Sequence, residues 1–69
     1  MDWSSIETSW ADFIASAKEQ WGRLSVGQLD STMGKREQLS SRVQRAYAVS
    51  AEEAERQIAD WQSRQRVRD

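Results

Sequence analysis

The most strongly patterned segment of the chain is Trp3-Ser4-Ser5-Ile6-Glu7-Thr8-Ser9-Trp10-Ala11-Asp12-Phe13-Ile14-Ala15-Ser16-Ala17-Lys18-Glu19-Gln20-Trp21-Gly22. Its large apolar side chains recur at spacings of three and four residues, which places them in one stripe about 100° wide on a helix. The stripe consists of Trp3, Ile6, Trp10, Phe13, Ile14, Ala17 and Trp21. Ser4 or Ser5 can cap the start, and Gly22 offers a left-handed residue at the end. The segment therefore predicts one long amphipathic helix that ends at Trp21.

Two helix starts downstream carry the capping-box pattern, in which a serine is followed three residues later by Glu or Gln. Ser25 with Gln28 opens a helix of about two turns, and Ser50 with Glu53 opens a last, longer helix. Between them, residues 35–47 have a helical period with one apolar side. The expected helices thus span approximately residues 4–21, 26–33, 35–47 and 51–64.

No segment alternates apolar and polar residues over the length of a strand, so the expected fold class is all-α. Short connections favour neighbouring helices that fold back on one another. We expect a compact antiparallel arrangement of four helices, two long and two shorter, in one domain over residues 1–69 whose tail, residues 65–69, frays. Gly34 marks a break or a close approach of two backbones. Arg36 falls on the apolar side of its helix, and we expect its charged head to extend to water.

The composition excludes several classes of chemistry. The 69 residues include no cysteine and no histidine, which rules out a disulfide framework, a Cys/His zinc site and a histidine general base. None of the serines lies in a motif that supplies an activating base. We therefore expect no enzyme activity, no cofactor, no metal site and no small-molecule substrate.

Charge and hydropathy also restrict the partners. No apolar run approaches the roughly 18 residues that span a bilayer, and Met1-Asp2-Trp3-Ser4 lacks the basic and apolar regions of a secretory signal. We expect a cytoplasmic protein without a membrane partner. Ten Lys and Arg residues stand against eleven Asp and Glu, a net charge of −1, which argues against strong field-driven binding to nucleic acid.

Five stretches carry a resemblance to a known family: Trp10-Ala11-Asp12-Phe13, Ala17-Lys18-Glu19-Gln20-Trp21-Gly22-Arg23-Leu24, Gly34-Lys35-Arg36-Glu37-Gln38-Leu39, Arg42-Val43-Gln44 with Tyr47, and Ala51-Glu52-Glu53-Ala54-Glu55 with Asp60-Trp61. Over almost its whole length the chain resembles the CsbD-like family of small bacterial stress-response proteins. The resemblance implies a small all-helical bacterial protein of the general stress response, and it offers no catalytic motif to carry over. The chain departs from the family where it has Ala15-Ser16, Ser40-Ser41 and Val26-Gly27.

Basic residues supply one signal for nucleic acid. Lys35, Arg42 and Arg45 fall on one flank of the third helix, and Arg64, Arg66 and Arg68 lie near the end of the chain. Several such residues together can contact phosphates. A solvated helix flank is the preferred interpretation, because a dedicated binder shows a basic domain and the isoelectric point here is about 5.4. Weak association with nucleic acid through these six residues is the alternative function.

The four tryptophans permit two interpretations. Trp3, Trp10 and Trp21 share the apolar face of the first helix, so we expect them in the core. Trp61 lies at the edge of a narrow stripe near the chain end, where it is a candidate anchor for a partner. We expect a monomer or a weak homo-oligomer. The predicted function is that of a non-enzymatic helical stress-response protein that acts through its surface on an unidentified macromolecule, or as an abundant protective protein.

Overall fold

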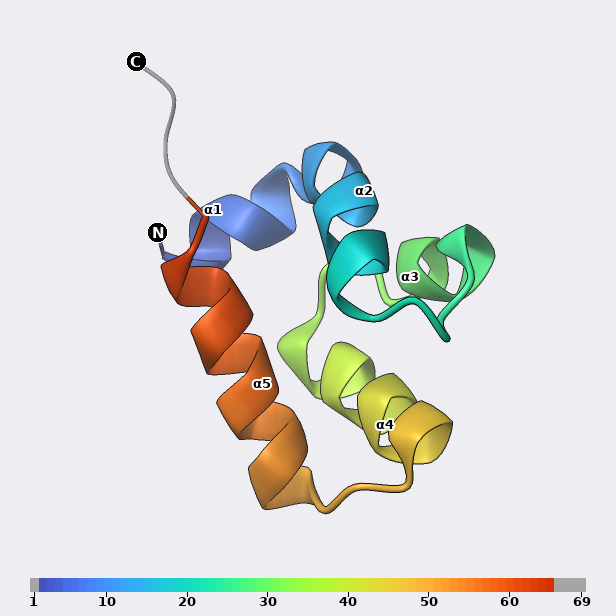
Figure 1. The fold of residues 1–69 in the computed structure, drawn as a ribbon. Helices are drawn as coiled ribbons and strands as arrows, with labels where there is room; N and C mark the ends of the chain where they lie inside the picture. The colour runs from blue at the N-terminus through green and yellow to red at the C-terminus, as the bar shows by residue number, and fades with distance from the viewer. Residues whose placement is uncertain (1, 66–69) are drawn as a thin grey trace.

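The computed structural model describes residues 2–65, which form helices and turns and include no strand. This part of the chain contains five helices: α1 (Trp3–Thr8), α2 (Trp10–Gln20), α3 (Val26–Ser31), α4 (Arg36–Tyr47) and α5 (Ala51–Ser63) (Figure 1). The all-α fold class is confirmed, whereas the expected number of four helices is not. Among residues 2–65, no helix has both the length and the hydropathy to cross a membrane.

The fifth helix arises because the expected first helix is divided at Ser9. Ser9 has φ −109° and ψ 33°, outside the helical region, and α1 and α2 point in different directions on either side of it (Figure 1). A side-chain hydroxyl binds the helix backbone just before this residue: Thr8 Oγ1 donates to the carbonyl oxygen of Ser4 at 2.8 Å. Bonds of this kind bend helices. The apolar spacing continues through Ser9, so it could not reveal the break.

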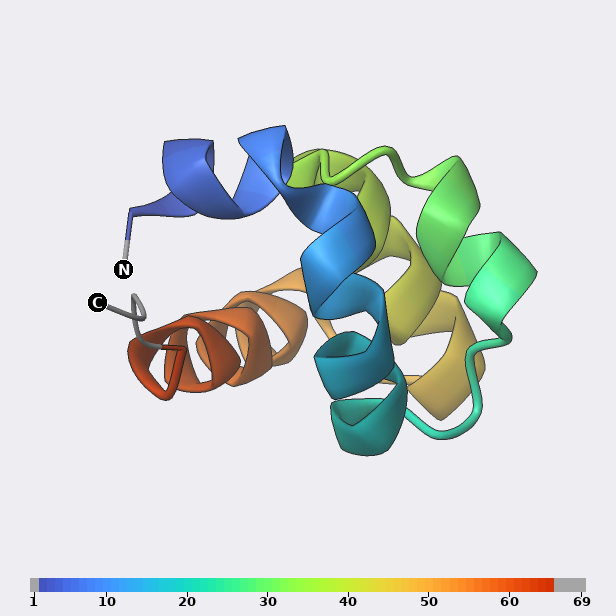
Figure 2. The same ribbon diagram turned by 90° about the horizontal axis from the view of Figure 1, so that it is seen from above.

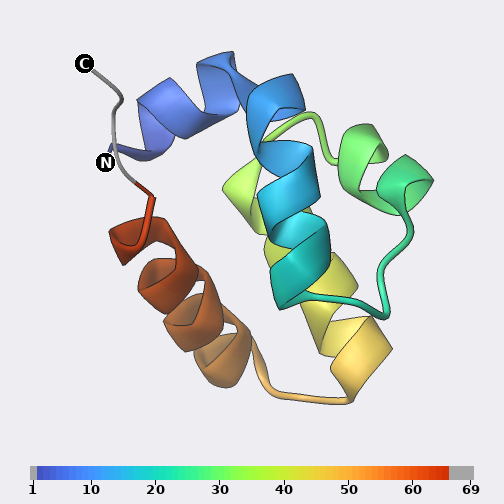
Figure 3. The ribbon, with the colours of Figure 1, turned by 45° about the horizontal axis from the view of Figure 1, so that its top comes forward.

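The helices pack chiefly as two pairs, α2 with α3 and α4 with α5. Helices α4 and α5 cross at a steep angle in Figure 2, although they look opposed in the view of Figure 3. The expected antiparallel arrangement is therefore not confirmed. Seen from above, α3 and α5 lie on opposite sides of α2 (Figure 2). The start of α1 returns to the end of α5, where the ring centroids of Trp3 and Trp61 are 6.0 Å apart.

Trp61 is the centre of the aromatic core. Its ring centroid lies 5.6 to 6.2 Å from those of Trp3, Trp10, Phe13 and Trp21, with interplanar angles between 52° and 80°. Tilted and edge-to-face arrangements of this kind are favourable for aromatic rings. The buried apolar residues are Ile6, Trp10, Ala17, Trp21, Leu24, Leu29, Leu39, Val43, Ala54, Ile58 and Trp61, and Trp3, Phe13 and Ile14 pack against them. The predicted apolar face of residues 3–21 is therefore the core face.

The predicted capping box at Ser25 is confirmed in full. Ser25 Oγ accepts from the Gln28 backbone N–H at 3.1 Å, and Gln28 Oε1 accepts from the Ser25 backbone N–H at 2.9 Å. At α5 half of the predicted box is present: Ser50 Oγ accepts from the Glu53 N–H at 3.1 Å, while the Glu53 carboxylate binds other side chains.

The two glycines singled out in the sequence have different roles. Gly34 has φ +76°, and a Cβ there would lie 3.0 Å from Glu7 Cα, so the predicted close approach is confirmed. Gly22 does not have a positive φ, and the prediction of a left-handed cap there is wrong. Lys18 Nζ instead donates to the carbonyl oxygens of Gly22 and Leu24, both at 2.8 Å. The ammonium thus holds the turn that follows α2, and the helix ends at Trp21 with φ −122° and ψ 73°.

Candidate functional site

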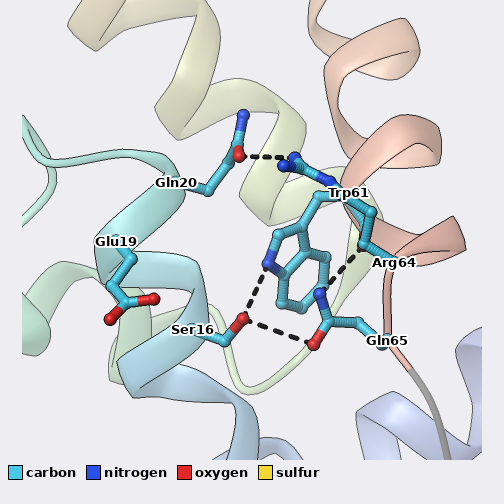
Figure 4. Close-up of a pocket in the computed structure, with 6 residues that line it drawn as sticks. All are labelled: Ser16, Glu19, Gln20, Trp61, Arg64 and Gln65. Carbon is cyan, nitrogen blue, oxygen red and sulfur yellow. Dashed lines mark hydrogen bonds between the residues drawn. The ribbon is translucent and has the colours of Figure 1, made fainter.

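A surface pocket beside Trp61 is formed by α2 and by the end of α5 (Figure 4). Trp61 Nε1 donates to Ser16 Oγ at 3.2 Å, and Ser16 Oγ donates to Gln65 Oε1 at 3.3 Å. Arg64 Nη2 donates to Gln20 Oε1 across the same pocket. Ser16, Gln20, Arg64 and Gln65 thus bond to one another or to Trp61 across the pocket and join the two helices, while the Glu19 carboxylate has no such bond.

Trp61 is consequently not a surface anchor. Its exposed fraction is 2%, and its ring is covered by the aromatic side chains of α1 and α2. The sequence placed Trp61 near a chain end, but the return of α1 onto the last turns of α5 buries it. The candidate anchor is thus corrected to a core residue.

The structure does not bring the predicted basic residues together. Lys35 Nζ lies 3.0 Å from Glu7 Oε2, so this cation is paired with α1. Arg64 Nη2 lies 3.3 Å from Asp60 Oδ2 and belongs to the far end of α5. Arg42 and Arg45 remain next to one another on α4. Arg66 and Arg68, the other two residues of the predicted set, lie outside the described residues.

Arg42 and Arg45 line a surface groove of about 400 Å³ between α4 and the turn that follows α2. We call it the arginine groove, and its lining residues are Arg23, Leu24, Gln28, Arg42, Arg45 and Ala46. Three of these six residues are arginines and none is acidic. Arg42 is half-buried and Arg45 is exposed. The groove is therefore a concentration of positive charge on a chain whose net charge is −1.

Tyr47 positions the third arginine. The Arg23 guanidinium carbon lies 5.4 Å from the centroid of the Tyr47 ring, a distance at which the ring face attracts a cation. Tyr47 Oη also accepts from the Arg23 backbone N–H at 3.1 Å, and Arg23 Nη1 donates to the Ala46 carbonyl oxygen at 3.4 Å. The end of α4 thus holds the turn after α2 in place and brings Arg23 to the groove.

Sequence reasoning missed Arg23 as a site residue. It follows Trp21-Gly22, where the helix was expected to stop, and it lies 19 residues before Arg42 in the chain. Nothing in local spacing joins a turn to a helix flank at that separation. The sequence showed only a single arginine in the expected turn, and the neighbouring residues of that turn were interpreted as helix caps.

Within residues 2–65, no three or more His, Cys, Asp or Glu side chains gather where they could hold a metal ion. Two acidic side chains near the start of α5 bind other side chains instead: Glu53 binds Arg56 and Gln57, and Glu55 binds Arg36.

Comparison with known proteins finds similar chains in several bacteria. A UPF0337 protein of Nitrosomonas europaea is 41% identical over 58 residues, which are 84% of this chain and 62% of that protein, so the match spans less than two thirds of it. The UPF0337 protein YjbJ of Escherichia coli is 35% identical over 60 residues, 87% of each chain. A UPF0337 protein of Pectobacterium atrosepticum is 41% identical over 54 residues, 78% of each chain. These names state no activity, ligand or partner.

No family model matches the chain. No solved structure matches it either.

Proposed function

The chain belongs to the UPF0337 family, and from this premise we propose that it is a non-enzymatic helical protein of the bacterial stress response that acts in the cytoplasm through its surface on another macromolecule. The proposal treats UPF0337 and the CsbD-like proteins as one family. The CsbD-like stretches run from Trp10 to Trp61, and relatives such as YjbJ match 87% of this chain. The stress role comes from that resemblance, and the proposal includes no cofactor.

The observation that supports the proposal is that all four indole N–H groups donate hydrogen bonds within the protein. The N–H groups of Trp3 and Trp10 donate to the carbonyl oxygens of Gly34 and Leu29, both at 2.9 Å. Those of Trp21 and Trp61 donate to Gln57 at 3.1 Å and to Ser16 at 3.2 Å. Within residues 2–65, every buried polar side-chain atom has a hydrogen-bond partner. The buried polar groups therefore serve the folded structure itself. We infer that the protein acts through groups on its surface.

The test is deletion of the gene in its own bacterium, followed by survival counts under osmotic, heat and stationary-phase stress. We expect lower survival under at least one stress and recovery when the wild-type chain is returned. Equal survival of both strains under every stress would overturn the stress role.

A charge-balanced variant tests whether the surface is responsible. Asp30→Asn, Glu52→Gln, Arg42→Gln and Arg45→Gln together remove two negative and two positive charges, so the net charge of −1 is kept. None of the four side chains forms an ion pair or a hydrogen bond within residues 2–65. We expect a folded variant that fails to restore survival, and full recovery would show that these surface charges are dispensable.

The second candidate function is weak association with nucleic acid, and one observation favours it. Arg42 and Arg45 have no carboxylate partner within residues 2–65, so they can contact phosphates without breaking an ion pair. Titration with duplex and single-stranded DNA should shift their amide NMR signals, and added salt should reverse the shifts between roughly 50 and 200 mM. Shifts that persist in high salt, or no shifts at low salt, would remove this candidate.

A further inference from the structure

The arginine groove offers hydrogen-bond donors from both of its walls. Arg42 and Arg45 are three residues apart on α4, and Arg23 faces them from the turn after α2. Gln28 adds a fourth donor group, because its Oε1 is occupied by the Ser25 N–H and its amide NH₂ has no partner in the described structure. The groove therefore presents three planar cations and one amide to whatever enters it.

Like charges one turn apart on a helix repel one another, and here no carboxylate relieves that repulsion. The described arginines outside the groove differ in this respect: Arg36, Arg56 and Arg64 each pair with an acidic side chain within 3.3 Å. An anion bound between Arg42 and Arg45 would supply the missing countercharge. The turn that carries Arg23 is already fixed by Tyr47 and by Lys18, so binding would order few additional groups.

The shape of the donor set favours phosphate over carboxylate. A guanidinium binds either group through two parallel N–H donors, but a carboxylate is flat and offers two oxygens. A terminal phosphate is tetrahedral and offers three, so it can accept from two arginines on one wall and from Arg23 on the other. The volume of about 400 Å³ is within the range of small-molecule sites. Leu24 and Ala46 in the lining allow a small organic part.

We propose that the arginine groove binds the terminal phosphate or diphosphate group of a small molecule, held by Arg23, Arg42 and Arg45. This goes beyond the proposed function, because it names a ligand chemistry and a place on the surface. It differs from the nucleic-acid candidate, which requires a series of separate phosphate contacts along a strand. The paired Lys35 and the distant Arg64 do not continue the groove into such a series.

The experiment is titration of the full chain with pyrophosphate, followed by amide NMR in a buffer free of phosphate and sulfate. We expect saturable shifts confined to residues 22–28 and 42–47. Arg42→Gln and Arg45→Gln should each weaken binding about tenfold, the range for loss of one charge-assisted hydrogen bond. The matched control is Arg56→Gln, which removes the same charge from an exposed position on α5 and should leave the affinity unchanged. Unchanged melting midpoints show that the variants remain folded.

Two further probes separate the sources of the signal. Citrate carries comparable charge on carboxylates, and oligothymidylate carries phosphodiesters on a strand. Equal binding of citrate and pyrophosphate would overturn the preference for phosphate. Binding of oligothymidylate without pyrophosphate would overturn the small-molecule site in favour of the nucleic-acid candidate. No saturable binding of pyrophosphate, or equal weakening by Arg56→Gln, would overturn the site while leaving the survival test of the proposed function untouched.

Discussion

The Arg36 guanidinium lies over the face of Trp3, with its central carbon 5.3 Å from the ring centroid. Arg36 Nε also donates to Glu55 Oε2 at 2.9 Å, and Nη1 donates to Gln62 Oε1 at 2.8 Å. The sequence predicts that Arg36 extends its charged head to water, but the head is used to join three helices. One side chain on α4 thereby ties α1 to α5.

Arg36→Ala should lower the free energy of unfolding by about 1 to 2 kcal/mol, because it removes a cation–π contact, an ion pair and a hydrogen bond from a half-buried position. Urea unfolding followed by circular dichroism measures the change. Arg56→Ala is the control, because its pair with Glu53 lies within one exposed helix face and should be worth less than about 0.5 kcal/mol. Equal losses in the two variants would show that Arg36 does not join the helices.

Gly34 is the position where a methyl group should do most harm. Its φ of +76° is costly for any other residue, and the added Cβ would lie 3.0 Å from Glu7 Cα and 3.1 Å from Trp10 Cβ. Gly34→Ala should therefore destabilise the fold by about 1 to 3 kcal/mol. At Gly22 a Cβ would meet nothing within 4 Å and φ is not positive, so Gly22→Ala should be neutral or stabilise by up to about 1 kcal/mol. Thermal unfolding of both variants checks the difference in sign, and a stable Gly34→Ala would contradict the close approach of α1.

Acid should weaken the fold partly through Glu53. The Gln57 amide donates to its carboxylate at 2.9 Å and Arg56 donates at 2.8 Å, and these bonds hold the pKa of Glu53 below its ordinary value. In the unfolded chain the pKa returns to its ordinary, higher value, so at a pH between the two pKa values the unfolded state binds more protons. The stabilisation is therefore fully present above the pKa of the unfolded chain and is lost as the pH falls through the lowered pKa of the folded state.

Glu53→Gln should accordingly reduce the fall in the urea midpoint as the pH drops from neutral through the range in which Glu53 becomes protonated. Glu52→Gln is the matched control, because Glu52 is also in the first turn of α5 and its carboxylate has no hydrogen bond or ion pair within residues 2–65. That variant should keep the acid sensitivity of the wild type. Parallel pH curves for the wild type and Glu53→Gln would contradict the role of this carboxylate.

Most of the helical structure could be predicted from sequence because its determinants are local. Apolar spacing placed the core face of residues 3–21, and Ser25 with Gln28 marked the start of α3 as the structure has it. The break at Ser9 was missed because one non-helical residue barely alters a stripe of period 3.6.

The candidate site was less predictable because it depends on contacts between distant segments. Arg42 and Arg45 are neighbours on one helix, so their shared flank follows from the sequence. Arg23 lies beside them because it contacts the Tyr47 ring, and Lys35 does not because it pairs with Glu7. Neither contact has a signature in local spacing, since each depends on how α1, α2 and α4 are packed.

The end of α4 offers a substitution that should stabilise the protein. Ala48 has φ 53° and ψ 45°, the left-handed conformation, and the N–H groups of Ala48 and Val49 both donate to the Gln44 carbonyl oxygen. Glycine adopts this conformation without the steric cost of a Cβ. Ala48→Gly should therefore raise the free energy of unfolding by about 0.5 to 1 kcal/mol. Ala59→Gly, on the exposed side of α5, should lower it by about 1 kcal/mol, because glycine disfavours a helix interior. Urea unfolding of the two variants should show opposite signs, and a loss of stability in both would mean that α4 does not end in a left-handed residue.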